Sequence, residues 1–490
     1  MKKIGTTLLC IVLSSAIYAQ HYIGVGVSDF SPANSVYLNP ASIVEYPDRF
    51  TLDLFAVNAA VDNNMLGLNT GYAFNSFFSQ TAANSSKLFV TNKKDQLSVT
   101  GPYLEARLPG FTWSISPTQS IAVGTRLRMF YQFNGIDKGV FETIVNPEGT
   151  TENTIGDNAL GKFDATMNTW SEIGITNAGV AYNRGAHKIK YGVTLRYLNG
   201  ISYVTAASKQ DTTYYVANKV FAVNNNVLVG TNLFGRLGDY PGGNAGTVSS
   251  WLLGNNGGHG MGADVGVEYE YNPYENDRYL FRISAAVTDI GYINYVVNNR
   301  SVLYKQIGGA TKDSANMYIT AIGYKLPGVT VTEMMPPKAA QIYLPTTLIT
   351  HVDYHMSKDY FVDLLFIGNL GKKDETGNAI YSQFTLTPYY DTKAFGFAFP
   401  ISYSFLSKKV KTGVGARFGK FFIGSDDMLL LFMKGQQGAN IYMGGSVSLG
   451  AMQVHGLNMN IHRPKLKLHF KKKNKPCSDC EPVMFNWGGR

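Results

Sequence analysis

Apolar and polar residues alternate along this chain with a period of two over long stretches. The pattern is nearly unbroken between residues 121 and 134, where one set of positions is apolar and the other includes Arg126 and Arg128. Because successive side chains of a β-strand point to opposite faces, this segment predicts a strand with one apolar face. It is much longer than the usual strand of roughly 5–6 residues, and crossing a bilayer takes only about 9–11 residues.

The same alternation recurs, and short polar turns join neighbouring segments into hairpins. The further segments with this pattern are 189–197, 279–288, 395–405 and 410–418. Longer stretches rich in Gly and Asn separate the hairpins at 62–98, 137–168, 203–260 and 295–340. Short turns at one end and long loops at the other are typical of transmembrane barrels, so we expect about 14 antiparallel strands, in a range of roughly 12–16.

Residues 1–20 are typical of a cleaved export signal. Lys2 and Lys3 precede an apolar run that ends near Ala19. The run is too short for a membrane-spanning helix of about 20 residues, so we interpret it as a signal peptide. No later stretch contains the roughly 18 consecutive apolar residues of a spanning helix, which argues against a helical membrane protein.

The composition agrees with an exported barrel. Charged residues make up 16% of the chain, whereas soluble domains average about 25%, and there are 31 Tyr, 28 Phe and 51 Gly. We therefore predict an all-β fold, a transmembrane antiparallel β-barrel of the cell outer membrane, for residues 49–450. A large secreted β-sandwich or propeller is the alternative. In the barrel, the apolar strand faces contact lipid and the opposite faces line the lumen.

Several basic residues fall on the faces that we expect to line the lumen. They are Arg126, Arg128, Lys188, Lys190, Arg196, Arg282, Lys411 and Arg417. These residues suit either an anion-selective path or a salt-bridged network with Glu268, Glu270 and Asp363 that fills the lumen, and we favour the network.

No catalytic or metal-binding set stands out. His351, Asp353 and His355 share one face of a strand, but the two histidines lie about 13 Å apart along it, so we favour a hydrated polar face over a metal site. The chain has no Gly-x-Ser-x-Gly, His-Glu-x-x-His or phosphate-loop motif. We therefore predict a protein that is not an enzyme and has no cofactor.

Residues 451–490 form a basic tail. The formal net charge of the chain is +9, but eight basic and only two acidic residues lie between Arg463 and Arg490, so the barrel itself is close to neutral and nucleic-acid binding is not indicated. With an even number of strands the tail lies in the periplasm, where lipid headgroups or partner proteins are within its reach. A disulfide between Cys477 and Cys480 is the plain expectation, with free thiols or half of a zinc site, to which His469 would add a third ligand, as alternatives.

Residues 21–48 carry the most informative motif, Asn39-Pro40-Ala41, just before the first long strand. Here the chain resembles outer-membrane barrels related to long-chain fatty-acid transporters, in which this segment folds back as a hatch within the barrel. The stretches 262–269, 344–348 and 413–426 also look like this group. The chain is most similar to an uncharacterised barrel family of the Bacteroidota type, itself similar to barrels of gliding motility and type IX secretion.

The resemblance implies passive transport or binding of a hydrophobic or amphipathic small molecule. One alternative is a non-enzymatic scaffold or accessory barrel of a secretion or gliding-motility complex. The other is a structural barrel without a ligand. The ligand-contacting residues of the fatty-acid transporters match no identifiable positions here, so the resemblance assigns no ligand site.

Overall fold

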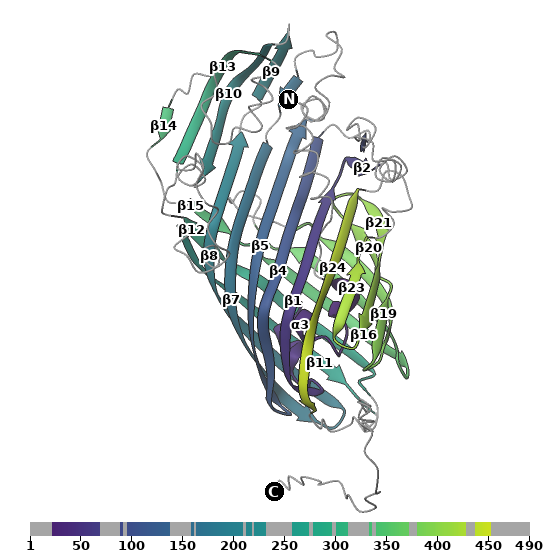
Figure 1. The fold of residues 1–490 in the computed structure, drawn as a ribbon. Helices are drawn as coiled ribbons and strands as arrows, with labels where there is room; N and C mark the ends of the chain where they lie inside the picture. The colour runs from purple at the N-terminus through teal and green to yellow at the C-terminus, as the bar shows by residue number, and fades with distance from the viewer. Residues whose placement is uncertain are drawn as a thin grey trace, which may run out of the picture.

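Most of the described residues form the wall of a closed antiparallel β-barrel (Figure 1). The computed structural model describes residues 22–68, 89–91, 96–137, 158–160, 163–208, 212–217, 220–231, 257–273, 278–295, 300–311, 333–335, 340–371, 380–427 and 437–451. The wall has 14 strands, which confirms the predicted fold class and strand number.

The wall closes because its first and last strands pair along their whole length, with Asp48 opposite Ala451 and Asp62 opposite Gly438. The wall strands, in order around the barrel, are β1 (Asp48–Asn63), β4 (Gln96–Ser116), β5 (Gln119–Asp137), β7 (Phe163–Arg184), β8 (His187–Ser208), β11 (Gly258–Tyr271), β12 (Phe281–Tyr295), β15 with β16 (Ala340–Tyr343 and Thr347–Ser357), β17 (Tyr360–Asn369), β18 (Gln383–Asp391), β19 with β20 (Phe395–Ala398 and Ile401–Ser404), β21 with β22 (Lys409–Thr412 and Val414–Phe418), β23 (Phe421–Ser425) and β24 (Gly438–Ala451).

The two ends of the barrel differ in their connections. Two-residue turns at 117–118, 185–186, 358–359 and 419–420 lie at one end, which we call the turn end. The connections at the opposite end, the loop end, are mostly much longer. Further strands lie there: β2 (Leu66–Leu68), β3 (Phe89–Thr91), β6 (Asn158–Leu160), β9 (Thr212–Ala217), β10 (Val220–Thr231), β13 (Arg300–Thr311) and β14 (Glu333–Met335). Of these, β10 pairs with β8, β9 and β13, so the wall continues upward as a sheet on one side (Figure 1).

Two wall strands are interrupted for identifiable reasons. Pro400 has no backbone N–H and separates β19 from β20, as expected for proline inside a sheet. In β12 the pairing shifts near Asp289, whose φ of 55° lies in the left-handed region. Above that bulge β12 pairs with β15, and below it with β16, so 344–346 form a matching break in the neighbouring strand.

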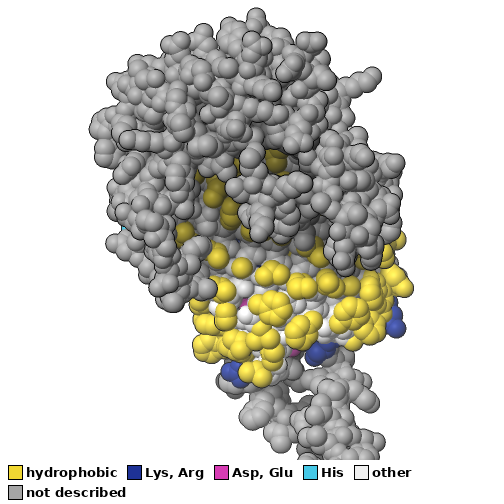
Figure 2. Space-filling view, turned by 45° about the horizontal axis from the view of Figure 1, so that its top comes forward, with side chains coloured by type: hydrophobic (Ala, Val, Ile, Leu, Met, Phe, Trp, Pro, Cys, Tyr) yellow, Lys and Arg dark blue, Asp and Glu magenta, His cyan; other side chains and the backbone are white. Residues whose placement is uncertain are grey.

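The outer face of the wall is apolar. Along β8, Ile189, Val193 and Leu195 are exposed, whereas the alternate residues Lys190 and Arg196 are buried. Figure 2 shows the outward apolar side chains gathered into a band across the visible face of the barrel, and exposed apolar residues lie on strands all around the wall. The opposite orientation would place buried charges against lipid, so the alternation fixes which face meets the bilayer.

Aromatic residues mark both edges of this belt. On β8, His187 packs against Tyr269 and Tyr271 near the turn end, and Tyr197 contacts His259 farther up. Ten residue steps along a strand tilted by about 40° correspond to about 25 Å, the height of the apolar band of an outer-membrane barrel. Separately, none of the helices in the described segments is long and apolar enough to cross a membrane.

Inside the barrel lies the hatch segment, residues 22–47. It contains α2 (Ile23–Gly26), α3 (Pro32–Ser35) and η1 (Pro40–Ile43), and most of its residues are buried. Gly192 of β8 and Gly266 of β11 make room for it, because a Cβ atom at Gly192 would collide with the backbone of Pro40 and Ala41. The wall and the hatch are therefore complementary in shape at this point.

The predicted motif residues hold the hatch in place. The Asn39 side chain accepts a hydrogen bond from the Ala41 N–H at 2.9 Å and donates one to the Val267 carbonyl of β11 at 3.0 Å. Pro40 occupies the first position of η1, where its missing N–H costs nothing. Asn39 thus caps the short helix and ties it to the wall with one side chain.

Candidate functional site: the barrel interior

The eight basic residues that we predicted to line the lumen all lie on the inner face. Seven of them are buried, and Lys188 is half-buried. Each forms an ion pair with at least one carboxylate. This geometry is that of a salt-bridged network, the alternative that we favoured over an anion-selective path.

Four arginines and four carboxylates form a central ion-pair layer across the middle of the lumen. Its members are Glu105, Arg107, Arg126, Arg128, Glu172, Arg196, Asp264 and Asp289, all buried. Arg126 pairs with Glu172, Arg196 pairs with Asp264, and Arg107 lies 2.6 Å from Glu105. The formal charges of the layer sum to zero, so the layer adds no net charge that would attract an anion or a cation into the lumen.

The layer connects strands that are not neighbours in the wall. The Arg128 guanidinium of β5 donates two hydrogen bonds to the Asp289 carboxylate of β12, at 2.8 and 2.9 Å. Arg196 of β8 donates to the same carboxylate at 3.2 Å. Since β5 and β12 lie four strands apart in a wall of 14, the Arg128 bonds span part of the lumen and join strands that do not pair with one another.

The sequence indicated the arginines of this layer but not most of their partners. Glu105 and Glu172 lie opposite Arg128 and Arg126 in the cross-strand register, so correct strand pairing would have found them. Asp289 was beyond such reasoning, because the bulge in β12 disturbs the alternation that decides which way its side chain points.

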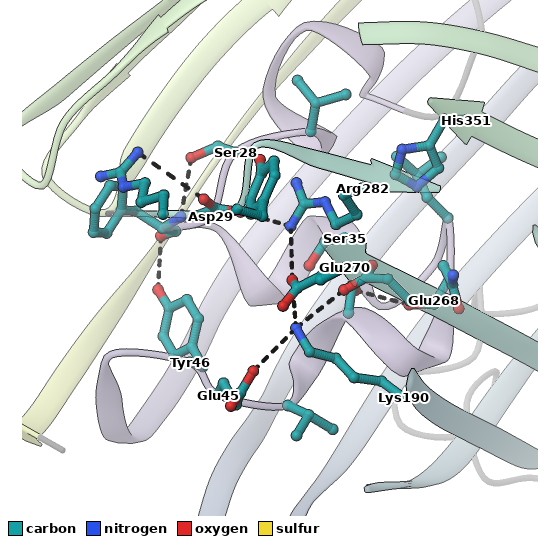
Figure 3. A pocket seen from close by; sticks show the side chains of 18 of the residues that line it. Ser28, Asp29, Ser35, Glu45, Tyr46, Lys190, Glu268, Glu270, Arg282 and His351 are labelled. Carbon is teal, nitrogen blue, oxygen red and sulfur yellow. Dashed lines mark hydrogen bonds and ion pairs between the residues drawn. The ribbon is translucent and has the colours of Figure 1, made fainter. Parts of the chain in front are cut away.

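A cavity of about 130 Å³ lies near the turn end, between the hatch and strands β8, β11 and β12 (Figure 3). Its apolar side is formed by hatch residues such as Phe30, Leu38 and Val44. On its polar side, Lys190 reaches Glu45 of the hatch at 3.3 Å and Glu270 of β11 at 2.6 Å. The hatch is thereby joined to the wall by charge as well as by shape.

The polar face at His351, Asp353 and His355 is partly buried behind this cavity. The Nδ1 atom of His351 lies 3.1 Å from an Asp363 carboxylate oxygen. Asp353 accepts hydrogen bonds from the hydroxyls of Tyr279 and Tyr389, both at 2.6 Å, and from Arg282 at 3.0 Å. Across the described segments, no three His, Cys, Asp or Glu side chains are placed to hold a metal ion together.

Above the central layer, towards the loop end, the inner face changes from charged to apolar. Buried aromatic and aliphatic residues from several wall strands form one cluster there, including Tyr103, Phe130, Trp170, Leu198, Tyr203, Ile293, Tyr295, Leu344, Leu365 and Ile367. Some are also tied across the barrel, since the Tyr295 hydroxyl of β12 donates to the Asn168 side chain of β7 at 2.5 Å. We call this cluster the apolar inner cluster; its side chains pack against one another and are almost fully buried.

Carboxylates of the wall anchor the first part of the hatch. Asp426 accepts hydrogen bonds from the N–H groups of Ile23 and Gly24, at 3.2 and 3.1 Å. Asp391 accepts from the Ser28 hydroxyl and the Asp29 N–H. Three phenols of the hatch are enclosed by the wall, and burial raises the pKa of Tyr22, Tyr37 and Tyr46.

Several predicted features lie outside the described residues. They include the signal peptide of residues 1–20, the tail from residue 452 onward, and Cys477 and Cys480. The predicted disulfide, the periplasmic position of the tail and its partners therefore stay predictions.

The comparisons with known proteins identify the family of this chain. The model of a family described as a family of unknown function, DUF5723, matches residues 40–426. The protein belongs to the DUF5723 family. The match spans the wall from η1 to Asp426, and it confirms the expectation of an uncharacterised family. No curated protein matches this DUF5723 chain.

Solved structures similar to this DUF5723 protein include hydrocarbon transporters. The toluene transporter TbuX of Ralstonia pickettii is 11% identical over 89% of this chain and 95% of its own, with a TM-score of 0.40. The toluene transporter TodX of Pseudomonas putida is 10% identical over 88% and 96%, with a TM-score of 0.39. The monoaromatic hydrocarbon channel CymD is 10% identical over 89% and 100%, with a TM-score of 0.38.

The closed wall, its apolar outer belt and its aromatic edges make this DUF5723 protein an outer-membrane β-barrel. The resemblance to barrels of gliding motility and type IX secretion gains no support from the comparisons and stays a prediction.

Proposed function

We propose that the protein binds and passively transports a small hydrophobic or amphipathic molecule across the outer membrane. The observation that carries the proposal is the apolar inner cluster. The interior of an outer-membrane barrel is ordinarily polar, and nothing in the wall itself requires inward residues such as Phe130, Trp170 and Leu198 to be apolar. An apolar inner surface favours an apolar ligand because it offers no replacement for the hydration shell of an ion.

The central ion-pair layer supports the same choice. Its arginines are already paired with carboxylates, so they provide no excess charge to attract an anion. Hydrogen bonds within the layer, and between the layer and the hatch, also occupy the lumen. This arrangement suits selective passage of small molecules better than an open aqueous pore.

Trp170 offers a direct test, because it lies buried in the apolar inner cluster while Trp113 is exposed on the outer belt. A variant with Trp113→Phe, Trp251→Phe and Trp487→Phe leaves Trp170 as the only tryptophan. We expect bromobenzene to quench its fluorescence saturably, toluene to compete, and the anion 4-bromobenzoate to have little effect. The matched control keeps Trp113 alone and should show only the non-saturable quenching of a probe dissolved in the membrane.

Uptake of the same probes into liposomes containing the protein then separates transport from binding. Non-saturable quenching of Trp170, equal to that of Trp113, would contradict a ligand site at the apolar inner cluster. If such a protein also co-purified stably with other proteins from mild detergent, the scaffold alternative would be favoured.

A further inference from the structure

The exposed charged side chains at the turn end of the described chain are all basic. Arg49 lies at the start of β1 and Arg184 at the end of β7, while Lys358 and Lys393 lie in the turns that follow β16 and β18. Among the described residues, the acidic ones at this end are buried or half-buried; Asp359, for example, is half-buried beside Lys358. None of the four basic residues has an ion-pair partner within the described residues.

Three of these basic residues lie near an exposed aromatic side chain at the edge of the apolar belt. Arg49 directly precedes the half-buried Phe50, and neighbouring side chains of a strand point to opposite faces. The three exposed aromatic residues lie two residues away in sequence: Tyr182 beside Arg184, Tyr360 beside Lys358 and Phe395 beside Lys393. Figure 2 shows basic side chains along the lower edge of the belt. Aromatic rings at the belt edge lie at the level of lipid headgroups, so long basic side chains next to them reach the phosphates.

The part of the loop end that the structure describes has a different charge pattern. In the described part of that end, the exposed charged residues are Asp164 and Lys408, one of each sign. The four basic residues at the turn end, in contrast, lie at several positions around the barrel: at the start of β1, at the end of β7, in the β16–β17 turn and in the β18–β19 turn. Exposed positive charges at several positions around the barrel are complementary to a negatively charged membrane surface, which also surrounds the barrel.

We propose that this basic rim, defined as Arg49, Arg184, Lys358 and Lys393, binds the headgroups of anionic phospholipids in the leaflet at the turn end. The apolar belt fixes the depth of the barrel, and the rim selects negatively charged headgroups from the lipids in contact with it. Each basic residue near an anionic membrane surface gains attraction from it, and this attraction is screened by salt. The inference does not depend on the transported molecule.

Spin-labelled lipids in reconstituted phosphatidylcholine membranes test the proposal. We expect spin-labelled phosphatidylglycerol to be immobilised by the full-length protein about two- to fivefold more strongly than spin-labelled phosphatidylcholine. The preference should disappear in a variant with Arg49→Gln, Arg184→Gln, Lys358→Gln and Lys393→Gln, and should shrink in high salt. Lys471→Gln, Lys472→Gln and Lys473→Gln are added to every protein so that the basic tail contributes less to the signal.

Two controls match this variant. Exchanging each rim Arg for Lys and each rim Lys for Arg keeps the charge and should keep the preference, as should Lys408→Gln at the loop end. If the fourfold variant does not fold, the pairs Arg49→Gln with Arg184→Gln and Lys358→Gln with Lys393→Gln should each lose part of the preference. Equal immobilisation of both lipids by the unaltered rim, or an undiminished preference in folded Gln variants, would overturn the proposal.

Discussion

The Asp289 carboxylate accepts hydrogen bonds from both terminal nitrogens of the Arg128 guanidinium, at 2.8 and 2.9 Å, although the two residues are 161 positions apart in the chain. Asp289 holds this position from a bulge in β12 with a φ of 55°. Its own N–H donates to Asp264 at 2.8 Å, so the bulge is locked by the ion-pair layer that it completes. The hydrogen bonds and ion pairs of Asp289 therefore offset the cost of its left-handed backbone conformation.

Replacing Asp289 should destabilise the whole barrel. Asp289→Ala leaves the buried Arg128 without its bidentate partner and removes a partner of Arg196, and breaking a buried pair from one side typically costs about 3–5 kcal/mol. The free energy of unfolding in urea, measured in lipid vesicles, checks this. Asp164→Ala removes an exposed carboxylate at the loop end and should change it by less than about 0.5 kcal/mol.

Adding a single methyl group at Gly192 should displace the hatch. A Cβ at this position would collide with the backbone of Pro40 and Ala41, and overpacking of this kind costs about 1–3 kcal/mol. Limited proteolysis of residues 22–47 should then become faster. Gly262→Ala on the adjacent strand is the control, since the first atom its Cβ would meet is a Leu344 methyl at 3.3 Å. Equal protection of the hatch in both variants would show that the glycine does not define its seat.

Asn39 should contribute through both ends of its amide. Asn39→Ala removes the hydrogen bonds to the Ala41 N–H and the Val267 carbonyl, and we expect hatch docking to weaken by about 1–2 kcal/mol. Asn39→Asp keeps the acceptor for Ala41 but loses the donor to Val267. Hydrogen exchange of the Ala41 amide should therefore be fast in Asn39→Ala and slower in Asn39→Asp. Identical exchange in the two variants would mean that the cap is unimportant.

Alkaline pH should release the hatch. Burial raises the pKa of Tyr22, Tyr37 and Tyr46, so the docked phenols stay protonated where released phenols, with a pKa of about 10, ionise. The released state then binds fewer protons, and docking stability falls as the pH rises past about 10. Phenolate absorbance at 295 nm and protease cleavage of the hatch should rise together. A variant with all three tyrosines changed to Phe should lose this pH dependence; if it keeps the same profile, other groups control release.

Much of the architecture was predictable because it depends on local pattern. The alternation along 121–134 and 189–197 decides which face of each strand is apolar, and it correctly separated outward residues such as Leu195 from inward ones such as Arg196. The motif Asn39-Pro40-Ala41 was recognised from its resemblance to a known barrel family, and the structure shows that its role is partly local, since Asn39 caps a short helix of neighbouring residues. These features need no knowledge of which strand pairs with which.

The sequence by itself determined the barrel class, the approximate strand number and the identity of the inner faces. Only the tertiary structure decided what the inward charges meet. The contact between Arg128 and Asp289 depends on the closure of all 14 strands and on a one-residue bulge that reverses the expected direction of a side chain. The close contact between Pro40 and Gly192 likewise joins the hatch to a strand that is distant in the sequence. Such contacts depend on distances across the lumen, which alternation along a single strand does not encode.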